Sequence, residues 1–246
     1  MRVAGATVSP GRLDSEFSEA LLHALRREVH AAAPAGTPDD VVRLELTGVG
    51  AGSAILYLEP AQDSRIQTED ELLQAPDPLD DAVRTVLDLH SAAESQADLG
   101  RFAPAKDLLR AFDALTTSLD EHDLALGMLW RARTGTSDQA QLTRTGRDHA
   151  RPFLERVPEF QDITLTGRVT ILDIEGGFTL RTSMARNAPR YEVRLPEETA
   201  LTDLGLQLGS TVTVRVRRAV ARARLGLESR PRYEFLEMVA DEVTLT

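Results

Sequence analysis

The sequence predicts an α+β protein, in which a mixed helix and hairpin domain precedes a small OB-like β-barrel of five to six strands. Apolar residues recur at helical spacing before Pro158 and alternate with polar residues from Ile163 onward. The charge balance changes in the same region. The 12 acids and 12 arginines between Phe160 and Thr246 cancel, so residues 1–159 carry the whole net charge of −11. We therefore expect an acidic α+β domain over residues 1–158 and a β-barrel domain over residues 160–246.

The first domain is expected to begin with a weak strand and a long amphipathic helix. Leu21, Leu25 and Val29 belong to an apolar stripe with steps of three and four residues. The expected elements are a strand over Arg2–Val8, a helix over Leu13–Ala33, a hairpin of Val42–Leu46 and Ala54–Leu58 around a glycine-rich turn, a surface loop over Gln62–Pro78, helices from Leu79 and from Leu108, a strand over Leu124–Ala132, a turn-rich segment over Thr134–Gln141, and a short helix over Thr145–Val157 interrupted at Pro152.

The second domain is expected to contain three strands, a short helix and two or three further strands. The strands are predicted over Ile163–Ile171, Phe178–Arg181, Tyr191–Leu195, Val212–Val216, Tyr233–Val239 and Val243–Leu245, with the helix over Glu197–Leu206. This order is similar to that of five-stranded Greek-key barrels that bind oligonucleotides or oligosaccharides. The similarity is one of topology, and it implies no functional residues.

The composition excludes several kinds of functional site. The chain has no cysteine, which excludes disulfides, thiolate metal sites and cysteine nucleophiles. No apolar run reaches the roughly 20 residues that a membrane span needs, and the N-terminus lacks a signal-peptide core. We expect a soluble, cytoplasmic, bacterial protein with no membrane partner and no cofactor.

Candidate catalytic groups are few. The paired carboxylates Asp39-Asp40, Asp80-Asp81 and Glu197-Glu198 stand at expected turns or helix starts, where acids stabilise free N–H groups. None of the five histidines belongs to an HxH, HExxH or HxxxH pattern, so no metal site is predicted. Asp148-His149 lies near several serines without a recognisable nucleophile motif.

An arginine-rich stretch is the candidate binding surface. Seven arginines lie between Arg215 and Arg232. Arg215 and Arg217 alternate with valines, so both are expected on the outer face of one strand, with Arg222 and Arg224 in the loop that follows. The rings available to stack on bases beside this stripe are Phe178, Tyr191, Tyr233 and Phe235, although the barrel needs some of them for its core. The alternative is a solvated face, paired with Glu192, Glu234 and Glu237 on neighbouring strands.

Three functions stay open. The leading hypothesis is a non-enzymatic regulatory or assembly protein, such as an antitoxin-like or effector-regulating accessory protein, that binds a protein partner of unknown identity and can form homo-oligomers. The second is a nucleic-acid-binding accessory protein that uses the Arg-rich face for single strands. The third is a hydrolase whose site is assembled from residues scattered along the sequence.

Overall fold

The computed structural model describes residues 1–5, 15–50, 54–60, 77–132, 134–173, 176–196 and 201–239. It is a mixed α+β structure that divides into two compact units. The first unit is Met1–Glu155 together with Ala223–Leu227, and the second is Arg156–Arg222 together with Glu228–Thr246. None of the described helices is both long and apolar enough to cross a membrane. That residues 160–246 fold on their own stays a prediction.

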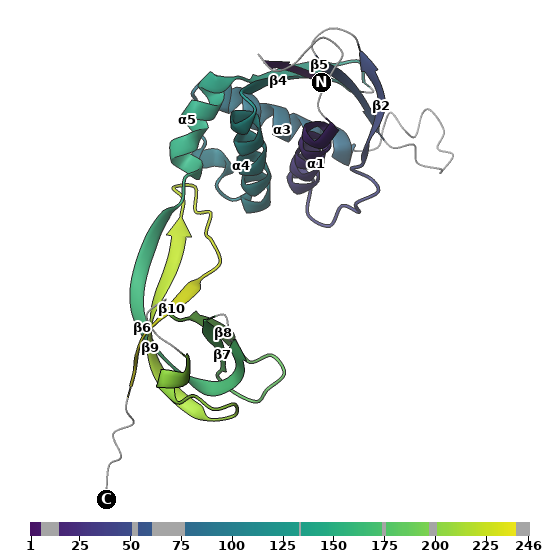
Figure 1. The fold of residues 1–246 in the computed structure, drawn as a ribbon. Helices are drawn as coiled ribbons and strands as arrows, with labels where there is room; N and C mark the ends of the chain where they lie inside the picture. The colour runs from purple at the N-terminus through teal and green to yellow at the C-terminus, as the bar shows by residue number, and fades with distance from the viewer. Residues whose placement is uncertain are drawn as a thin grey trace, which may run out of the picture. The chain divides into compact units, whose positions relative to one another are not determined.

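The first unit packs helices on one face of an antiparallel sheet (Figure 1). The sheet order is β2-β3-β1-β4-β5, with the short N-terminal strand at its centre. The described strands are β1 (Arg2–Gly5), β2 (Leu44–Gly50), β3 (Ala54–Pro60), β4 (Leu124–Arg131) and β5 (Ser137–Leu142). The described helices are α1 (Ser15–Ala32), α3 (Pro78–Glu94), α4 (Lys106–Glu121) and α5 (Arg144–Leu154), with the 3-10 turn η1 (Gly100–Phe102) before α4.

The apolar stripe of α1 lies in the core, as its spacing predicts. Leu21, Leu25 and Val29 are buried, whereas Leu22 is only partly buried at the edge of the core. The largest fully buried side chain is Phe112 of α4, which lies among leucines of α3 and α4. Helix α3 begins at the Asp77 cap, whose carboxylate accepts hydrogen bonds from the N–H groups of Leu79 and Asp80.

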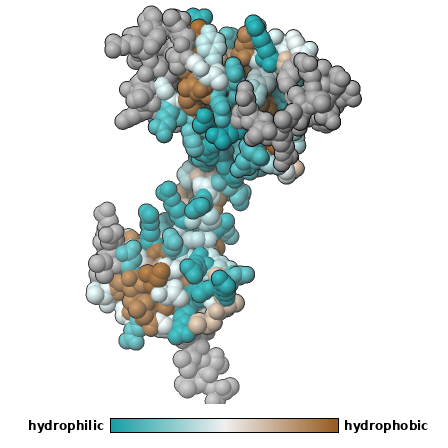
Figure 2. Space-filling model, turned by 90° about the vertical axis from the view of Figure 1, so that its right-hand side faces the viewer, coloured by the Kyte–Doolittle hydropathy of each residue, from teal (hydrophilic) through white to brown (hydrophobic). Residues whose placement is uncertain are grey.

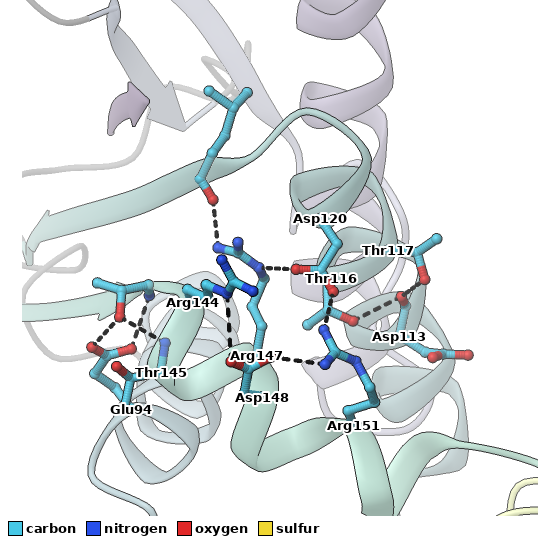
Figure 3. A network of polar contacts seen from close by, with 12 residues as sticks. Glu94, Asp113, Thr116, Thr117, Asp120, Arg144, Thr145, Arg147, Asp148 and Arg151 are labelled. Atoms are coloured by element: carbon cyan, nitrogen blue, oxygen red, sulfur yellow. Dashed lines mark hydrogen bonds and ion pairs between the residues drawn. The ribbon is translucent and has the colours of Figure 1, made fainter. Parts of the chain in front are cut away.

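A polar network fixes α5 against α4 and the start of β4 (Figure 3). The guanidinium of Arg147, which is 3% exposed, donates to Asp120 Oδ1 at 2.5 Å and to the carbonyl of Leu124. Arg151 donates to the other oxygen of Asp120 at 2.9 Å. Burial alone would raise the pKa of Asp120, but the hydrogen bonds and charges of the two arginines outweigh it and hold this pKa below its ordinary value.

The segment Ala223–Leu227 belongs to the first unit although it lies between two strands of the second. Leu225 and Leu227 are buried in the first unit's core, and the N–H of Leu225 donates to the carbonyl of Phe153 at 3.3 Å. Lys106, the only lysine of the chain, donates from Nζ to the Leu225 carbonyl at 2.6 Å. Gly226 has a φ of 74°, a conformation that favours glycine, and a Cβ there would collide with the Lys106 ammonium.

The second unit is a ring of five strands. They are β6 (Val157–Asp173), β7 (Gly177–Arg181), β8 (Arg190–Arg194), β9 (Thr211–Arg222) and β10 (Arg232–Met238), with the 3-10 turn η2 (Leu201–Leu204) between β8 and β9. Each strand pairs with two others in the order β10-β8-β7-β6-β9, and β9 pairs with β10 to close the ring. All pairs are antiparallel except β8 with β10.

Alternation along these strands separates an inner core from an outer wall. Phe178, Leu180, Val193, Val214 and Phe235 are buried inside the ring, with Phe178 and Phe235 in edge contact at 6.2 Å. The residues that alternate with them lie on the opposite face, where most of them are charged or carry a hydroxyl group, although Thr179 is itself buried. The outer wall is therefore the polar surface of this unit.

Several predicted elements need correction. The segment Thr134–Gln141, expected to be turn-rich, supplies the edge strand β5, and α5 continues through Pro152. Arg222 lies at the end of the long strand β9 and not in a loop. Of the helix expected over Glu197–Leu206, the described part forms only η2. The expected strand Val243–Leu245, most of the loop Gln62–Pro78 and the pair Glu197-Glu198 lie outside the described residues.

Candidate nucleic-acid interface

The arginines that the sequence analysis favours are largely neutralised by acids. Arg215 Nη1 lies 3.1 Å from Glu237, and Arg217 Nε lies 3.4 Å from Asp162. Arg222 forms ion pairs with two carboxylates, those of Glu159 at 3.1 Å and Glu228 at 3.0 Å. These contacts favour the alternative of a salt-paired face, with Glu237 as one of the expected partners.

Of the remaining predicted site residues, Tyr233 lines a hollow together with Arg217, whereas Arg224 and Tyr191 do not line it. Arg224 is exposed, but it belongs to the first unit. Tyr191 and Tyr233 contact each other edge to face, with ring centroids 5.2 Å apart, and both pack against the core of the ring. This packing leaves the two tyrosines half-buried, so they contribute less free ring surface than an open stacking platform requires.

A different set of arginines lies side by side on three adjacent strands of the outer wall. Arg168 of β6 lies directly opposite Arg181 of β7, which lies directly opposite Arg190 of β8. We call these three residues the arginine row. Side chains directly opposite on adjacent strands share one face, with strands about 4.8 Å apart. No described carboxylate forms an ion pair with any of the three. Like charges placed this way repel each other unless an anion lies between them.

The loop between β7 and β8 fixes the central member of the row. Arg181 Nη2 donates to the carbonyls of Ala185 at 2.9 Å and Arg186 at 2.8 Å. Its Nε is buried and has no hydrogen-bond acceptor. Among the described residues, the hydrogen-bond acceptor of the Arg168 side chain is the weak acceptor Sδ of Met184, at 3.6 Å. The Arg190 side chain is exposed and forms no hydrogen bond or ion pair with a described residue, so its donors are available to an anion, whereas the unpaired Nε of Arg181 is buried.

A shallow hollow continues the basic surface where β8, β10 and β9 lie side by side. We call it the wall hollow, and its lining residues are Arg194, Leu195, Pro196, Arg217, Ala219, Arg232, Tyr233 and Glu234. Arg194 shares the outer face of β8 with Arg190, about 13 Å further along at the usual rise per residue. Neither Arg194 nor Arg232 forms an ion pair with a described residue. Glu192 and Glu234 are the acids on this path, and neither of them forms an ion pair with a described residue either.

An exposed aromatic ring lies opposite Ala219, one of the residues that line the wall hollow. Phe160 of β6 is 65% exposed and lies opposite Ala219 of β9, which lies opposite Arg232 of β10. The small Ala219 side chain thus lies between an exposed ring and a guanidinium. Figure 2 shows that hydrophilic side chains dominate the visible surface, with separate hydrophobic patches on each unit.

No family model, curated protein or solved structure matches this chain. The site is therefore interpreted from its own chemistry. Guanidinium groups bind phosphate oxygens through paired hydrogen bonds, and an exposed ring beside them offers a surface on which a base can stack.

The other candidate groups have structural contacts. Asp80 accepts hydrogen bonds from Arg84 and from the indole of Trp130. Asp148 pairs with Arg151 at 2.8 Å, and His149 lies against the Ala97 carbonyl at 2.9 Å. No group of three or more potential metal ligands occurs among the described residues. Asp148 and His149 thus contact different partners, which gives no support to the hydrolase hypothesis.

Sequence reasoning missed the arginine row and Phe160. Arg181 follows the buried Leu180, and Arg190 precedes Tyr191, which packs against the core of the ring. The alternation along each strand therefore predicts that both arginines point outward. That Arg168, Arg181 and Arg190 share one row depends on strand register, which alternation does not determine.

Proposed function

We propose that the protein is a non-enzymatic accessory factor that binds single-stranded nucleic acid on the outer wall of its second unit. The observation that carries the proposal is the arginine row, which continues through Arg190 and Arg194 into the wall hollow. An elongated basic surface with an exposed aromatic ring suits a flexible polyanion whose bases are free to stack.

The pairing order of the ring supports the proposal. Its first strand, β6, pairs with the second and fourth strands, while the third and fifth strands, β8 and β10, pair in parallel. This is the arrangement expected of an OB-like barrel, in which the second and third strands form a ligand-binding face. Two members of the arginine row lie on those strands, β7 and β8. Fold similarity is only an analogy for function, so the proposal depends on the arginines.

The test compares two double variants that lose the same charge. The first, Arg190→Gln with Arg194→Gln, removes guanidiniums that form no ion pair with a described residue. The second, Arg215→Gln with Arg222→Gln, removes guanidiniums that acids already neutralise. Binding of a fluorescent single-stranded oligonucleotide is measured by anisotropy between 50 and about 200 mM salt, where phosphate contacts dominate affinity.

The first variant is expected to bind at least about tenfold more weakly than wild type, since each charge-assisted hydrogen bond is worth about 1.5 kcal/mol or more. Its log–log salt slope should fall by about 1.4, because each phosphate contact on a single strand contributes about 0.7. The second variant should change affinity much less. Equal losses in both variants, or no binding by wild type at about 50 mM salt, would refute the proposal.

Protein binding is the second candidate function, favoured by the outer face of the first unit's sheet. Tyr57 of β3 and Leu129 of β4 are each 54% exposed on this face, on either side of β1. Exposed apolar side chains of this size occur at protein interfaces. A stoichiometric partner that co-purifies with wild type and is lost from Tyr57→Ser with Leu129→Ser would support this function. Unchanged co-purification would place the partner elsewhere.

A further inference from the structure

The first unit carries a second basic site on α1, which is independent of the proposed nucleic-acid surface. His23, Arg26, Arg27 and His30 follow the spacing i, i+3, i+4 and i+7, so they project from one side of the helix over two turns. The opposite side of α1 is buried in the core, through Leu21 and Leu25 among others. These four side chains therefore face away from the core.

A hollow of about 600 Å³ lies beside them, and we call it the α1 hollow. Besides the four α1 residues, its charged lining consists of Asp39 and Arg43 from the segment after α1, and Asp107 and Arg110 from α4. Four arginines and two histidines thus face two carboxylates, in the part of the chain that carries the whole excess of acids. Such local clustering against the net charge is not expected of a plain solubilising surface.

The ion pairs leave part of this positive charge unused. Arg110 pairs with Asp107 at 2.6 Å, Arg43 pairs with Glu45 at 3.7 Å, and His30 lies 3.6 Å from Asp39. Arg26 and Arg27 form no ion pair with a described residue. These two guanidiniums are adjacent in sequence and line the same hollow, so they can contact one ligand together.

We propose that the α1 hollow binds a small polyphosphate group, either free or as the phosphate chain of a nucleotide. Guanidinium groups match phosphate oxygens in geometry and charge, and the volume falls within the range of small-molecule sites. A chain of phosphates, with several charges in a row, can contact Arg26 and Arg27 on α1 together and lie near the paired Arg43 and Arg110 across the hollow.

The test is titration calorimetry of the full-length protein with inorganic tripolyphosphate at pH 7 and low salt. Arg26→Gln with Arg27→Gln is expected to weaken binding at least tenfold, the value of about one charge-assisted hydrogen bond. The control, Arg131→Gln with Arg144→Gln, removes two exposed arginines of the first unit outside the hollow. It should leave the affinity within about twofold. A nucleoside triphosphate run in parallel shows whether a base adds affinity.

A gain of function gives a second readout. Asp39→Asn with Asp107→Asn removes the two carboxylates of the hollow and should tighten tripolyphosphate binding severalfold. No heat and no thermal stabilisation by tripolyphosphate at millimolar concentration, or equal losses in the test and control variants, would overturn the inference. Oligonucleotide binding should be unchanged in Arg26→Gln with Arg27→Gln, so failure of this site and failure of the proposed function are separable.

Discussion

Glu28 on α1 and His90 on α3 form a buried pair. Replacing both with leucine should change the free energy of unfolding little, whereas replacing either one alone should lower it strongly. Both side chains are 0% exposed, and His90 Nε2 lies 3.1 Å from Glu28 Oε2. The ring of His90 also packs edge-on against Phe112 at 5.2 Å. Its Nδ1 has no hydrogen-bond partner, so the carboxylate is the ring's polar contact in the core.

His90→Leu strands the Glu28 carboxylate in an apolar core and should cost about 3 to 5 kcal/mol. Glu28→Leu leaves the imidazole without an acceptor and should cost about 1 to 3 kcal/mol. The double change to leucine removes both polar groups and fills the space, so its stability should lie within about 1 kcal/mol of wild type or above it. The coupling energy of the cycle is then about 3 kcal/mol or more. For a unit of this size, the His90→Leu loss corresponds to a melting temperature lower by roughly 6 to 20 °C.

Urea unfolding followed by tryptophan fluorescence measures this cycle. Trp130 is the only tryptophan of the chain, and it lies in β4 of the first unit with its indole N–H donating to Asp80 at 2.6 Å. The signal therefore reports the unit that contains the pair. His23→Leu, at an exposed histidine of α1, is the control and should change stability by less than about 0.5 kcal/mol. Additive losses, with the double variant as unstable as the two single losses combined, would refute the reasoning.

Three further predictions concern the first unit, each followed through Trp130. Leu25→Ala should cost about 2 to 5 kcal/mol, and Leu22→Ala clearly less because Leu22 is only partly buried; equal losses would contradict the described core. Leu227→Ala should destabilise the same transition by a similar 2 to 5 kcal/mol, and a transition that does not move would show that Ala223–Leu227 does not belong to this core. Because the pKa of Asp120 is lowered in the folded state, its contribution is complete above the ordinary carboxyl pKa of about 3.8 and is lost as the pH falls through the lowered value. Asp120→Asn should therefore unfold with a weaker dependence on acid below about pH 4, and an unchanged acid profile would exclude this role.

Helical spacing predicted the helices of the first unit closely. Each of them packs an apolar stripe against one face of the sheet, and such a stripe leaves a regular pattern of apolar residues in the sequence. The same reasoning failed at β5, whose residues Ser137–Leu142 are mostly polar. An edge strand with one open face needs few apolar residues, so its pairing with β4 left little trace in the sequence.

The sequence predicted a basic surface on the second unit, but not which arginines are free of acidic partners among the described residues. Alternation identified an outer basic face on β9, but it could not show that acids on β6 and β10 neutralise Arg215 and Arg217. Ion pairs across a sheet depend on register and on side-chain reach, which are properties of the folded chain. The arginine row of Arg168, Arg181 and Arg190 depends on register in the same way.

The placement of Ala223–Leu227 has a consequence for inheritance. Neither compact unit is encoded by one uninterrupted stretch of the gene, since five codons of the first unit stand inside the coding region of the second. A single recombination event between Glu155 and Arg156 would separate Leu225 from the Lys106 and Phe153 groups that bind its backbone, and Leu227 from the core in which it is buried. We expect the two units to be transmitted and to diverge together. Chimeras should keep the first unit folded only when they exchange this short segment along with Met1–Glu155.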